Sequence, residues 1–284
     1  MVLHIGFIMD GNRRYAKEMG LEKFEGHLAG LKKMMQVIKW QIKYNIYETT
    51  FFALSTDNLK KRDSEELFGI LKLIKQFKDD KEFIDYLFQM QVSIKFKGDM
   101  EGLKNSEKIK DYYDVLDLGS FFYRKFFLNY EKGYFKDFGI LVDLNEKNSN
   151  VKKMDLFFDF LLNSNYVLGD FANPKHIVNI CVNYGGIDEI CTTFKNMIQE
   201  VKSGNLKVEQ INYDDLKKCS YFYDSSPLDI IVRTGDAFRL SGFMLLHSAY
   251  SEMYFSSKMW PEFDEEDLKQ VLNLSLNTVK NFGK

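Results

Sequence analysis

Short apolar runs that stop at turn-forming residues recur along this chain and predict buried strands. The first run spans residues 5–9 and ends at Asp10, Gly11 and Asn12. Further β-rich runs cover residues 49–54, 92–96, 176–183 and 228–233. Helical periodicity separates several of these runs, and this alternation is typical of an α/β domain with a largely parallel sheet.

The helical pattern is clearest where apolar residues recur at every third or fourth position. It predicts an amphipathic core helix from residue 28 to about residue 45, preceded by a short helix over 16–20 and a loop over 23–27. A second long helix is predicted from Ser64 to about residue 88. Its apolar stripe is interrupted by the charged residues 78–82, which indicates a bulge or a kink.

Bulk composition excludes several classes of protein. The 284 residues are 45% hydrophobic and 28% charged, which is ordinary for a globular protein. A formal net charge of −2 gives no reason to expect nucleic acid. Three widely spaced cysteines indicate neither a disulfide framework nor a zinc site. No apolar stretch is long enough to span a membrane and no signal peptide is recognisable, so we expect a cytoplasmic protein.

The turn after the first strand carries the first candidate chemistry. Gly11 allows close approach of a phosphate to the backbone, and Arg13 and Arg14 add charge that stays ionised. Asp10, at the carboxyl end of the strand, is suited to hold a magnesium ion against that phosphate. The residues alone also fit an ordinary Asp-Gly turn followed by a solvated basic helix start.

A second candidate anion site follows the strand over 228–233. Arg233 lies at the carboxyl end of that strand, and Arg239 and Ser241 follow six and eight residues later, at a predicted helix start. Two guanidinium groups and a hydroxyl that converge on one pocket would clamp a diphosphate. Without other information, scattered surface arginines are the alternative interpretation.

Taken in order, these segments resemble the signatures of the cis-prenyltransferases, the family of undecaprenyl and dehydrodolichyl diphosphate synthases. Residues 9–16 resemble Met-Asp-Gly-Asn-x-Arg-[Trp/Tyr]-Ala. Residues 233–243 resemble Arg-Thr-Gly-x-x-x-Arg-[Leu/Ile]-Ser-x-Phe, and the resemblance continues at residues 23–27, 55–59, 176–186 and 250–263. The resemblance runs through these segments in order and covers about four-fifths of the chain.

Four positions depart from the family pattern. Lys23 and Lys61 stand where the family has arginine, which keeps the charge and loses the bidentate fork. Leu59 replaces a tryptophan and Ile187 an arginine. Residues from about 111 to 173 are unlike the family, and we interpret them as an insertion within a single domain that spans 1–284. The insertion is either a surface element or one that touches a membrane or a partner.

The resemblance implies a fold and a set of residue roles. The fold is one α/β domain whose central sheet is flanked by helices that enclose an apolar tunnel. The allylic diphosphate site would contain Gly11, Asn12, Arg13, Arg14, Lys23 and His27, and the isopentenyl diphosphate site Asn58, Lys61, Arg233, Arg239 and Ser241. Asp10 and Glu252 would bind Mg²⁺, and Asp10, Asn12, His27 and Ser55 would form the catalytic set. The proton acceptor stays open.

Simpler roles remain possible for two of these residues. His27 alone would be a loop histidine without function, and Ser55 fits equally well as the cap of the next helix.

The implied activity is magnesium-dependent condensation of isopentenyl diphosphate onto an allylic diphosphate such as farnesyl diphosphate. The charged interruption at 78–82 suggests a long polyprenyl, dehydrodolichyl-type product of dolichol biosynthesis. The resemblance also implies a homodimer, with contact to the endoplasmic reticulum or another membrane left open. The alternative is a non-catalytic partner subunit of a hetero-oligomeric prenyltransferase. A trans-prenyltransferase is disfavoured because Asp79-Asp80 lacks the third aspartate of Asp-Asp-x-x-Asp.

Overall fold

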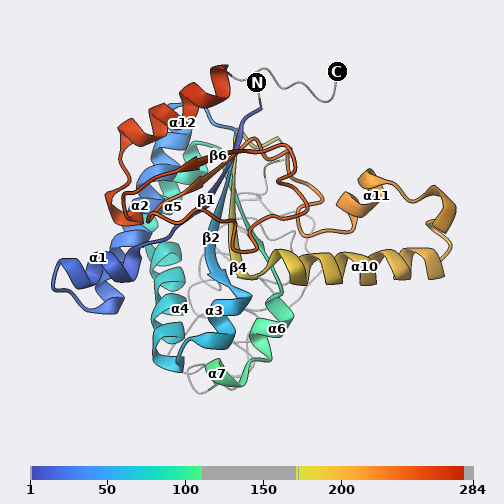
Figure 1. The fold of residues 1–284 in the computed structure, drawn as a ribbon, viewed down its shortest axis with the longest axis horizontal. Helices are drawn as coiled ribbons and strands as arrows, with labels where there is room; N and C mark the ends of the chain where they lie inside the picture. Colours follow the sequence, from blue (N-terminus) through green and yellow to red (C-terminus); the bar gives the residue numbers. More distant parts are fainter. Residues whose placement is uncertain (1, 111–170, 172, 278–284) are drawn as a thin grey trace, which may run out of the picture.

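The computed structural model describes residues 2–110, 171 and 173–277 and centres on a six-stranded sheet (Figure 1). The strands lie in the order β3-β4-β2-β1-β5-β6, and every neighbouring pair is parallel. Their bounds are β1 (His4–Ile8), β2 (Glu48–Ser55), β3 (Val92–Lys97), β4 (His176–Tyr184), β5 (Ile230–Arg233) and β6 (Glu252–Phe255). The predicted α/β fold with a largely parallel sheet is confirmed.

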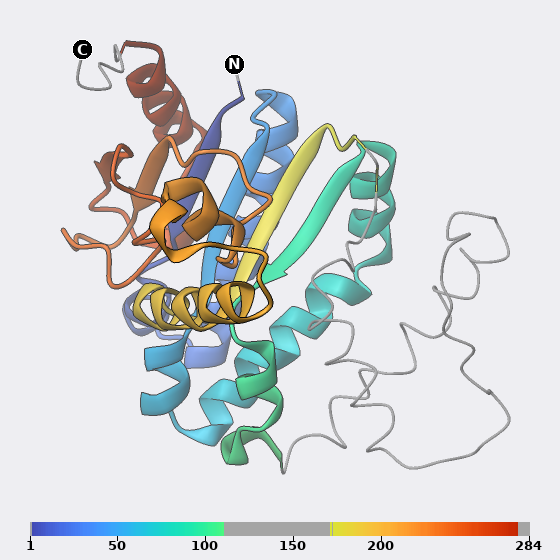
Figure 2. The ribbon, with the colours of Figure 1, turned by 90° about the vertical axis from the view of Figure 1, so that its right-hand side faces the viewer.

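Helices cover both faces of this sheet. Figure 2 looks onto the face that carries α10 and α11, and α2, α4 and α5 lie behind the sheet. The helices are α1 (Asn12–Glu18), α2 (Lys23–Lys43), α3 (Thr56–Lys61), α4 (Ser64–Asp79), α5 (Lys81–Gln89), α6 (Met100–Lys104), α7 (Glu107–Lys110), α10 (Gly186–Lys202), α11 (Tyr213–Lys218) and α12 (Glu265–Asn277). Because both faces are covered, β1 and β4 are buried along their whole length, which explains their continuous apolar character.

Aromatic side chains fill the core between the sheet and α2. Phe7 and Phe51 stack with ring centroids 5.2 Å apart, and Trp260 stacks on Phe263 at 5.7 Å. Trp260 also donates its indole N–H to the backbone carbonyl of Gly30 on α2, at 2.8 Å. These contacts join the C-terminal part of the chain to the first strand, and so to the turn that follows it.

Two predicted elements differ from the structure. The predicted loop over 23–27 is the first turn of α2, because Glu22 and Glu25 form a capping box that extends the helix backwards. The single long helix from Ser64 is two helices. α4 ends at Asp79, and the Asp80 side chain accepts a hydrogen bond from the backbone N–H of Phe83 and starts α5. The predicted interruption of the stripe is therefore a complete break.

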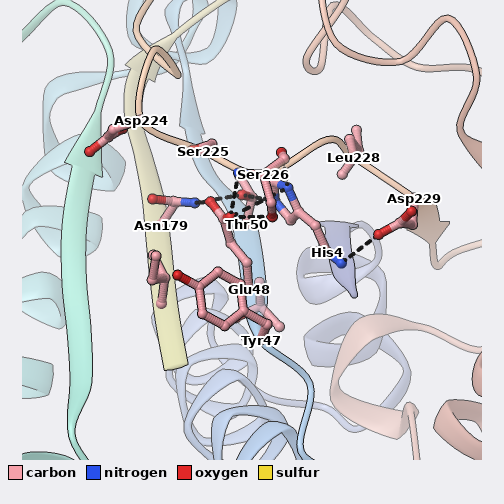
Figure 3. Close-up of polar contacts among 12 residues, drawn as sticks. His4, Tyr47, Glu48, Thr50, Asn179, Asp224, Ser225, Ser226, Leu228 and Asp229 are labelled. Carbon is pink, nitrogen blue, oxygen red and sulfur yellow. Dashed lines mark hydrogen bonds and ion pairs between the residues drawn. The ribbon is translucent and has the colours of Figure 1, made fainter. Parts of the chain in front are cut away.

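The amino ends of the central strands share a buried polar network (Figure 3). Glu48 accepts hydrogen bonds from the backbone N–H and hydroxyl of Ser226, at 2.8 and 2.5 Å, and from the amide of Asn179 at 2.7 Å. His4 lies between Thr50, 2.8 Å from its Nε2, and the carbonyl of Ser226, 3.0 Å from its Nδ1. The network ties the segment before β5 to the sheet.

Among the described residues, no helix is both long enough and apolar enough to cross a bilayer. The predicted insertion at 111–173 lies outside the described residues, apart from residues 171 and 173.

Candidate active site

The turn between β1 and α1 is shaped by one glycine. Gly11 has a φ of 111°, and a Cβ there would lie 2.8 Å from the Cβ of Met259. A residue with a side chain would therefore be both strained and obstructed. Asp10, immediately before it, keeps 35% of its side chain exposed at the carboxyl end of β1. The predicted turn thus presents a carboxylate at the edge where parallel sheets bind ligands.

Helix α2 packs unusually closely against this turn. A Cβ on Gly26 would lie 2.3 Å from the backbone oxygen of Asn12, and one on Gly30 would lie 2.5 Å from its Oδ1. The two glycines therefore allow α2 to carry His27 to the side of Asn12. The Oδ1 atom of Asn12 is buried and has no hydrogen-bond partner among the described residues. A buried oxygen without a hydrogen bond lowers the stability of the fold unless a ligand or water donates one.

Arg233 joins the first turn to the loop after β5. Its Nη2 donates to Asp10 Oδ2 at 2.9 Å, and its Nη1 donates to Ser241 Oγ at 2.7 Å and to the carbonyl of Arg239 at 2.5 Å. Arg14 Nη2 lies 3.5 Å from the other oxygen of Asp10 and donates to the carbonyl of Gly235 at 2.6 Å. The structure therefore brings Asp10, Arg14, Arg233 and Ser241 together.

Arg239 and Ser241 do not begin a helix as predicted. Residues 234–251 form successive turns, and Ser241 has a φ of 50°. The side chain of Arg233 fixes this loop, whereas Arg239 is exposed. Arg239 contacts the cluster through its backbone carbonyl. The predicted convergence of the Arg233 and Arg239 guanidinium groups is therefore not seen in the described residues.

A second cluster forms around Glu66, in the first turn of α4. Its side chain is 7% exposed and lies 3.2 Å from Arg62 Nη1, 3.2 Å from His27 Nε2 and 3.9 Å from Arg13 Nη1. Three cationic or potentially cationic groups thus share one carboxylate. Burial and the nearby Arg62 guanidinium lower the pKa of His27, against the opposing effect of Glu66. The cluster is suited to receive an anion.

Arg62 and Glu66 were not among the predicted site residues. Lys61, which was, points to solvent with 74% of its side chain exposed and pairs with Asp57 at 2.8 Å. Arg62 is only 15% exposed, and its buried Nε has no partner among the described residues. The i,i+4 spacing of Arg62 and Glu66 at a helix start is the sequence signal that was available. The structure places Arg62 in the Glu66 cluster and leaves Lys61 outside it, so the role of Lys61 stays a sequence prediction.

The remaining predicted residues have clear positions. Ser55 caps α3 by accepting a hydrogen bond from the backbone N–H of Asn58 at 3.0 Å, so the capping role is confirmed. Lys23 is exposed at the start of α2, and no contact with either cluster is recorded for it among the described residues.

An apolar cavity of about 80 Å³ opens beside Asn12 and His27. It extends between α2 and α4 and is lined mainly by Met9, Leu31, Met34, Ile70, Ile74 and Phe77. The cavity lies where the resemblance predicts a tunnel. An amphiphile with an anionic head and an apolar tail matches this combination of cations and apolar lining.

A larger cleft of about 830 Å³ lies between the end of β3 and helices α10 and α11. Its lining residues include Lys97, Asp99, Asn196 and Glu200, and none of the predicted site residues. Size alone therefore does not identify the site, and the convergence of charged groups on Asp10 and Glu66 is the better indicator.

The two predicted metal ligands are far apart in one chain. Glu252 begins β6 and pairs with Ile230 at the start of β5, whereas Asp10 follows β1 and contacts Arg233 at the end of β5. The length of β5 therefore separates the two carboxylates by roughly 10 Å along the strands. Magnesium ligands lie about 2 Å from the ion. Asp10, partly exposed beside Arg14 and Arg233, fits a magnesium ligand, and Glu252 of the same chain does not fit beside it.

Comparison with known proteins agrees with this architecture. The family model described as putative undecaprenyl diphosphate synthase matches residues 8–129 and 164–283. A tritrans,polycis-undecaprenyl-diphosphate synthase (geranylgeranyl-diphosphate specific) from Picrophilus torridus is 30% identical over 284 residues, covering 99% of this chain and 89% of the relative. An isoprenyl transferase from Clostridium perfringens is 28% identical, covering 100% of this chain and 90% of the relative.

A solved structure shares the fold. It is lavandulyl diphosphate synthase from Lavandula x intermedia in complex with dimethylallyl diphosphate. The TM-score is 0.71 with 20% sequence identity, and the match covers 99% of this chain and 98% of the other.

Proposed function

This chain belongs to the undecaprenyl diphosphate synthase family and is a cis-prenyltransferase, and we propose that it condenses isopentenyl diphosphate repeatedly onto an allylic diphosphate. The observation that carries the proposal is the placement of two cationic clusters beside one apolar cavity. Arg233 and Arg14 surround Asp10, and Arg62, His27 and Arg13 surround Glu66. Two diphosphates would bind at these clusters, and the apolar chain would enter the cavity, which has to widen from about 80 Å³ to hold it.

The first turn would hold the allylic diphosphate. Asn12 and His27 line the apolar cavity, and Gly11, Arg13 and Arg14 belong to the turn and helix start next to Asn12. We add Arg62 to this set and assign Lys23 only an outer electrostatic role, because its side chain is exposed. The allylic chain would enter the cavity between α2 and α4, with its first carbon left at the mouth.

Isopentenyl diphosphate would bind at Arg233, Ser241 and Arg239. Arg233 already orders the loop, and Ser241 Oγ lies 2.7 Å from its guanidinium. Asn58 stays in this proposal, whereas the exposed Lys61 does not. The cations and preorganised donors would stabilise charge on the departing allylic diphosphate as the carbocation develops. Asn12, His27 and Ser55 are the residues that would relay the released proton.

Magnesium is part of the proposal, with Asp10 as its protein ligand. When bound, the ion would neutralise charge on the leaving diphosphate. Asp10 would first have to exchange part of its contact with Arg233 for the metal, which its exposed side chain allows. If Glu252 also serves the ion, it would come from a second copy of the chain, in the proposed homodimer.

The identities of the primer and the product are the most detailed part of the proposal. Farnesyl diphosphate is the expected primer, and the names of several relatives support geranylgeranyl diphosphate as a competitor. A long polyprenyl product is supported by the break between α4 and α5. Phe77, which lines the cavity, packs against Phe83 beyond this break, with ring centroids 5.7 Å apart. Movement at Asp80 would let the cavity lengthen.

The direct test supplies purified protein with labelled isopentenyl diphosphate and each primer, with magnesium or with a chelator. We expect magnesium-dependent polyprenyl products resolved by chain length. Asp10→Ala should remove them, whereas Asp214→Ala, an exposed carboxylate on α11, should not. An active Asp10→Ala variant would contradict the assigned role, and no product from the wild-type protein would contradict self-sufficient chain elongation.

A further inference from the structure

The loop that carries Arg239 and Ser241 is held in an unfavourable backbone conformation. Ser241 has a φ of 50° and Met244 a φ of 46°, and Gly242 between them has a φ of 79°. Residues with a side chain seldom adopt this region without support from their surroundings. Arg233 supports one side of the loop through Ser241 and the carbonyl of Arg239.

The junction between β4 and α10 supports the other side. The backbone N–H of Gly186 donates to the carbonyl of Gly242 at 2.7 Å, and a Cβ on Gly186 would lie 2.6 Å from that oxygen. The hydroxyl of Tyr184 accepts a hydrogen bond from the backbone N–H of Met244 at 3.1 Å. Two of the unusual loop residues are therefore bonded directly to this junction.

A buried carboxylate completes the support. Tyr184 donates its hydroxyl proton to Glu189 Oε2 at 2.6 Å, and Glu189 Oε1 lies 3.1 Å from Nε2 of His247, at the end of the same loop. Tyr184 and Glu189 are fully buried, and the side chain of His247 is 7% exposed. Burial and the neighbouring Glu189 raise the pKa of Tyr184, so its hydroxyl keeps the proton that Glu189 needs.

Glu189 acts on the loop through Tyr184 and His247. The buried carboxylate does not face the proposed substrates, because its two oxygens are taken by Tyr184 and His247. Both partners act on the loop, one at Met244 and one at the residue 247 end. A buried charge of this kind is costly, and it is retained where it fixes one conformation among several. Its effect on ligands is therefore transmitted through the position of Ser241.

We propose that Tyr184, Glu189 and His247 are positioning residues for the loop 239–247, and that through this loop they set the affinity of the enzyme for isopentenyl diphosphate. The second half of this inference rests on the proposed function. The first half is a property of the fold and is testable without catalysis.

The key variant is Tyr184→Phe, which removes the hydroxyl and keeps the ring. We expect the KM for isopentenyl diphosphate to rise about tenfold, with kcat changed less than about threefold and the KM for the allylic primer less than about twofold. Backbone amide hydrogen exchange in the segment 239–247 should accelerate about tenfold, as expected for the loss of one hydrogen bond.

Matched controls lie on or next to the same elements. Tyr221→Phe removes a hydroxyl that bonds Thr192 on α10, from a ring that packs against Tyr184. Glu200→Gln changes a carboxylate on α10 that contacts Asn205 instead. Both controls should keep the wild-type KM and exchange rate. His247→Gln, which retains a donor for Glu189, should stay close to the wild type, whereas His247→Leu should resemble Tyr184→Phe.

Two results would overturn the proposal. One is faster exchange in Tyr184→Phe with an unchanged KM for isopentenyl diphosphate. The other is a uniform loss of thermal stability, kcat and both KM values, as a purely structural role would give. If the wild-type protein makes no product, the proposed function fails. Calorimetric titration of wild type and Tyr184→Phe with inorganic diphosphate then decides the positioning role, because only a positioning role weakens binding in the variant.

Discussion

The two ends of the central sheet hold polar clusters of opposite character. At the amino ends, His4, Glu48 and Thr50 are fully buried, and each has partners within the chain (Figure 3). At the carboxyl ends, Asp10 remains 35% exposed, and Arg233 keeps a buried Nε without a partner among the described residues. The same strands thus end in a closed network on one side, shielded from solvent and with its charged groups paired, and in an incomplete one on the other. Within the closed network, the Oδ1 of Asn179 also lacks a partner among the described residues.

This difference separates stability from function. The closed network fixes how the segment before β5 attaches to the sheet, and its complete burial keeps ligands away from it. An incomplete network costs stability until a ligand supplies the missing partners, which is typical of a binding site. Both clusters contain charged residues, so charge alone does not distinguish them. The exposure of Asp10 and the unpaired guanidinium nitrogen of Arg233 do.

The sharpest test removes Arg233 from the incomplete network. Arg233→Ala should reduce kcat/KM for isopentenyl diphosphate by about 10³-fold, because the guanidinium both contacts Asp10 and orders the loop at Ser241. Steady-state kinetics with labelled substrate measures the loss. Lys217→Ala, a cation that bonds the carbonyl of Ser225 away from the site, is the control. Activity within tenfold of the wild type would remove Arg233 from the site.

The converse test opens the closed network. Glu48→Ala strips Asn179 and Ser226 of their shared acceptor and should lower the free energy of unfolding by about 3 kcal/mol. Denaturant titration measures this change. The activity of the molecules that remain folded should be unaltered. A selective loss of kcat at unchanged stability would contradict the division between the two ends.

A third test compares two adjacent cations. Arg62→Ala should raise the KM for the allylic diphosphate about tenfold, because Arg62 belongs to the Glu66 cluster at the cavity mouth. Lys61→Ala should change it less than about twofold, as an exposed ion pair contributes little. Equal effects of the two substitutions on this KM would show that Arg62 does not bind the allylic diphosphate.

The smallest expected effect is a pH dependence from the closed network. Burial raises the pKa of Glu48, but His4 and the hydrogen bonds from Ser226 and Asn179 outweigh it and hold the pKa below the ordinary 4.5. The unfolded chain therefore binds a proton more readily than the folded one, so this stabilisation is present above pH 4.5 and is lost as the pH falls through the folded pKa.

Denaturant titrations of the wild type and Glu48→Gln at successive pH values measure that contribution. The wild type should lose more stability than the variant as the pH falls below 4.5, since the variant has no proton to gain at this position. Parallel curves would show that Glu48 does not contribute.

Local patterns predicted most of the fold because parallel strands are continuous apolar runs with turn residues at their ends. The first turn and Arg233 were predicted for the same reason. Lys61 lies on the solvent side of α3, where it pairs with Asp57, whereas Arg62, the extended residue that ends α3, has its side chain in the Glu66 cluster. The direction of the backbone at the end of α3 decides whether Lys61 or Arg62 faces Glu66. The local sequence pattern does not reveal that direction.

Other misses came from contacts distant in sequence. Gly26 suggested a loop, but its lack of a side chain serves the packing of α2 on α1. The loop after β5 was predicted as helical, and its conformation depends on Tyr184, more than fifty residues earlier. Strand register separates Glu252 from Asp10 within one chain, and their predicted pairing around magnesium stays a prediction. Each of these depends on how the chain assembles.

His27, beside Glu66 at the cavity, also couples substrate binding to proton uptake. In the protein without substrate, burial and Arg62 lower the pKa of His27. A diphosphate placed beside the imidazole would favour its charged form and raise that pKa again. Binding would then draw a fraction of a proton from the buffer near neutral pH. The measured binding enthalpy should accordingly vary with the ionisation enthalpy of the buffer, and this dependence should vanish when His27 is replaced by asparagine.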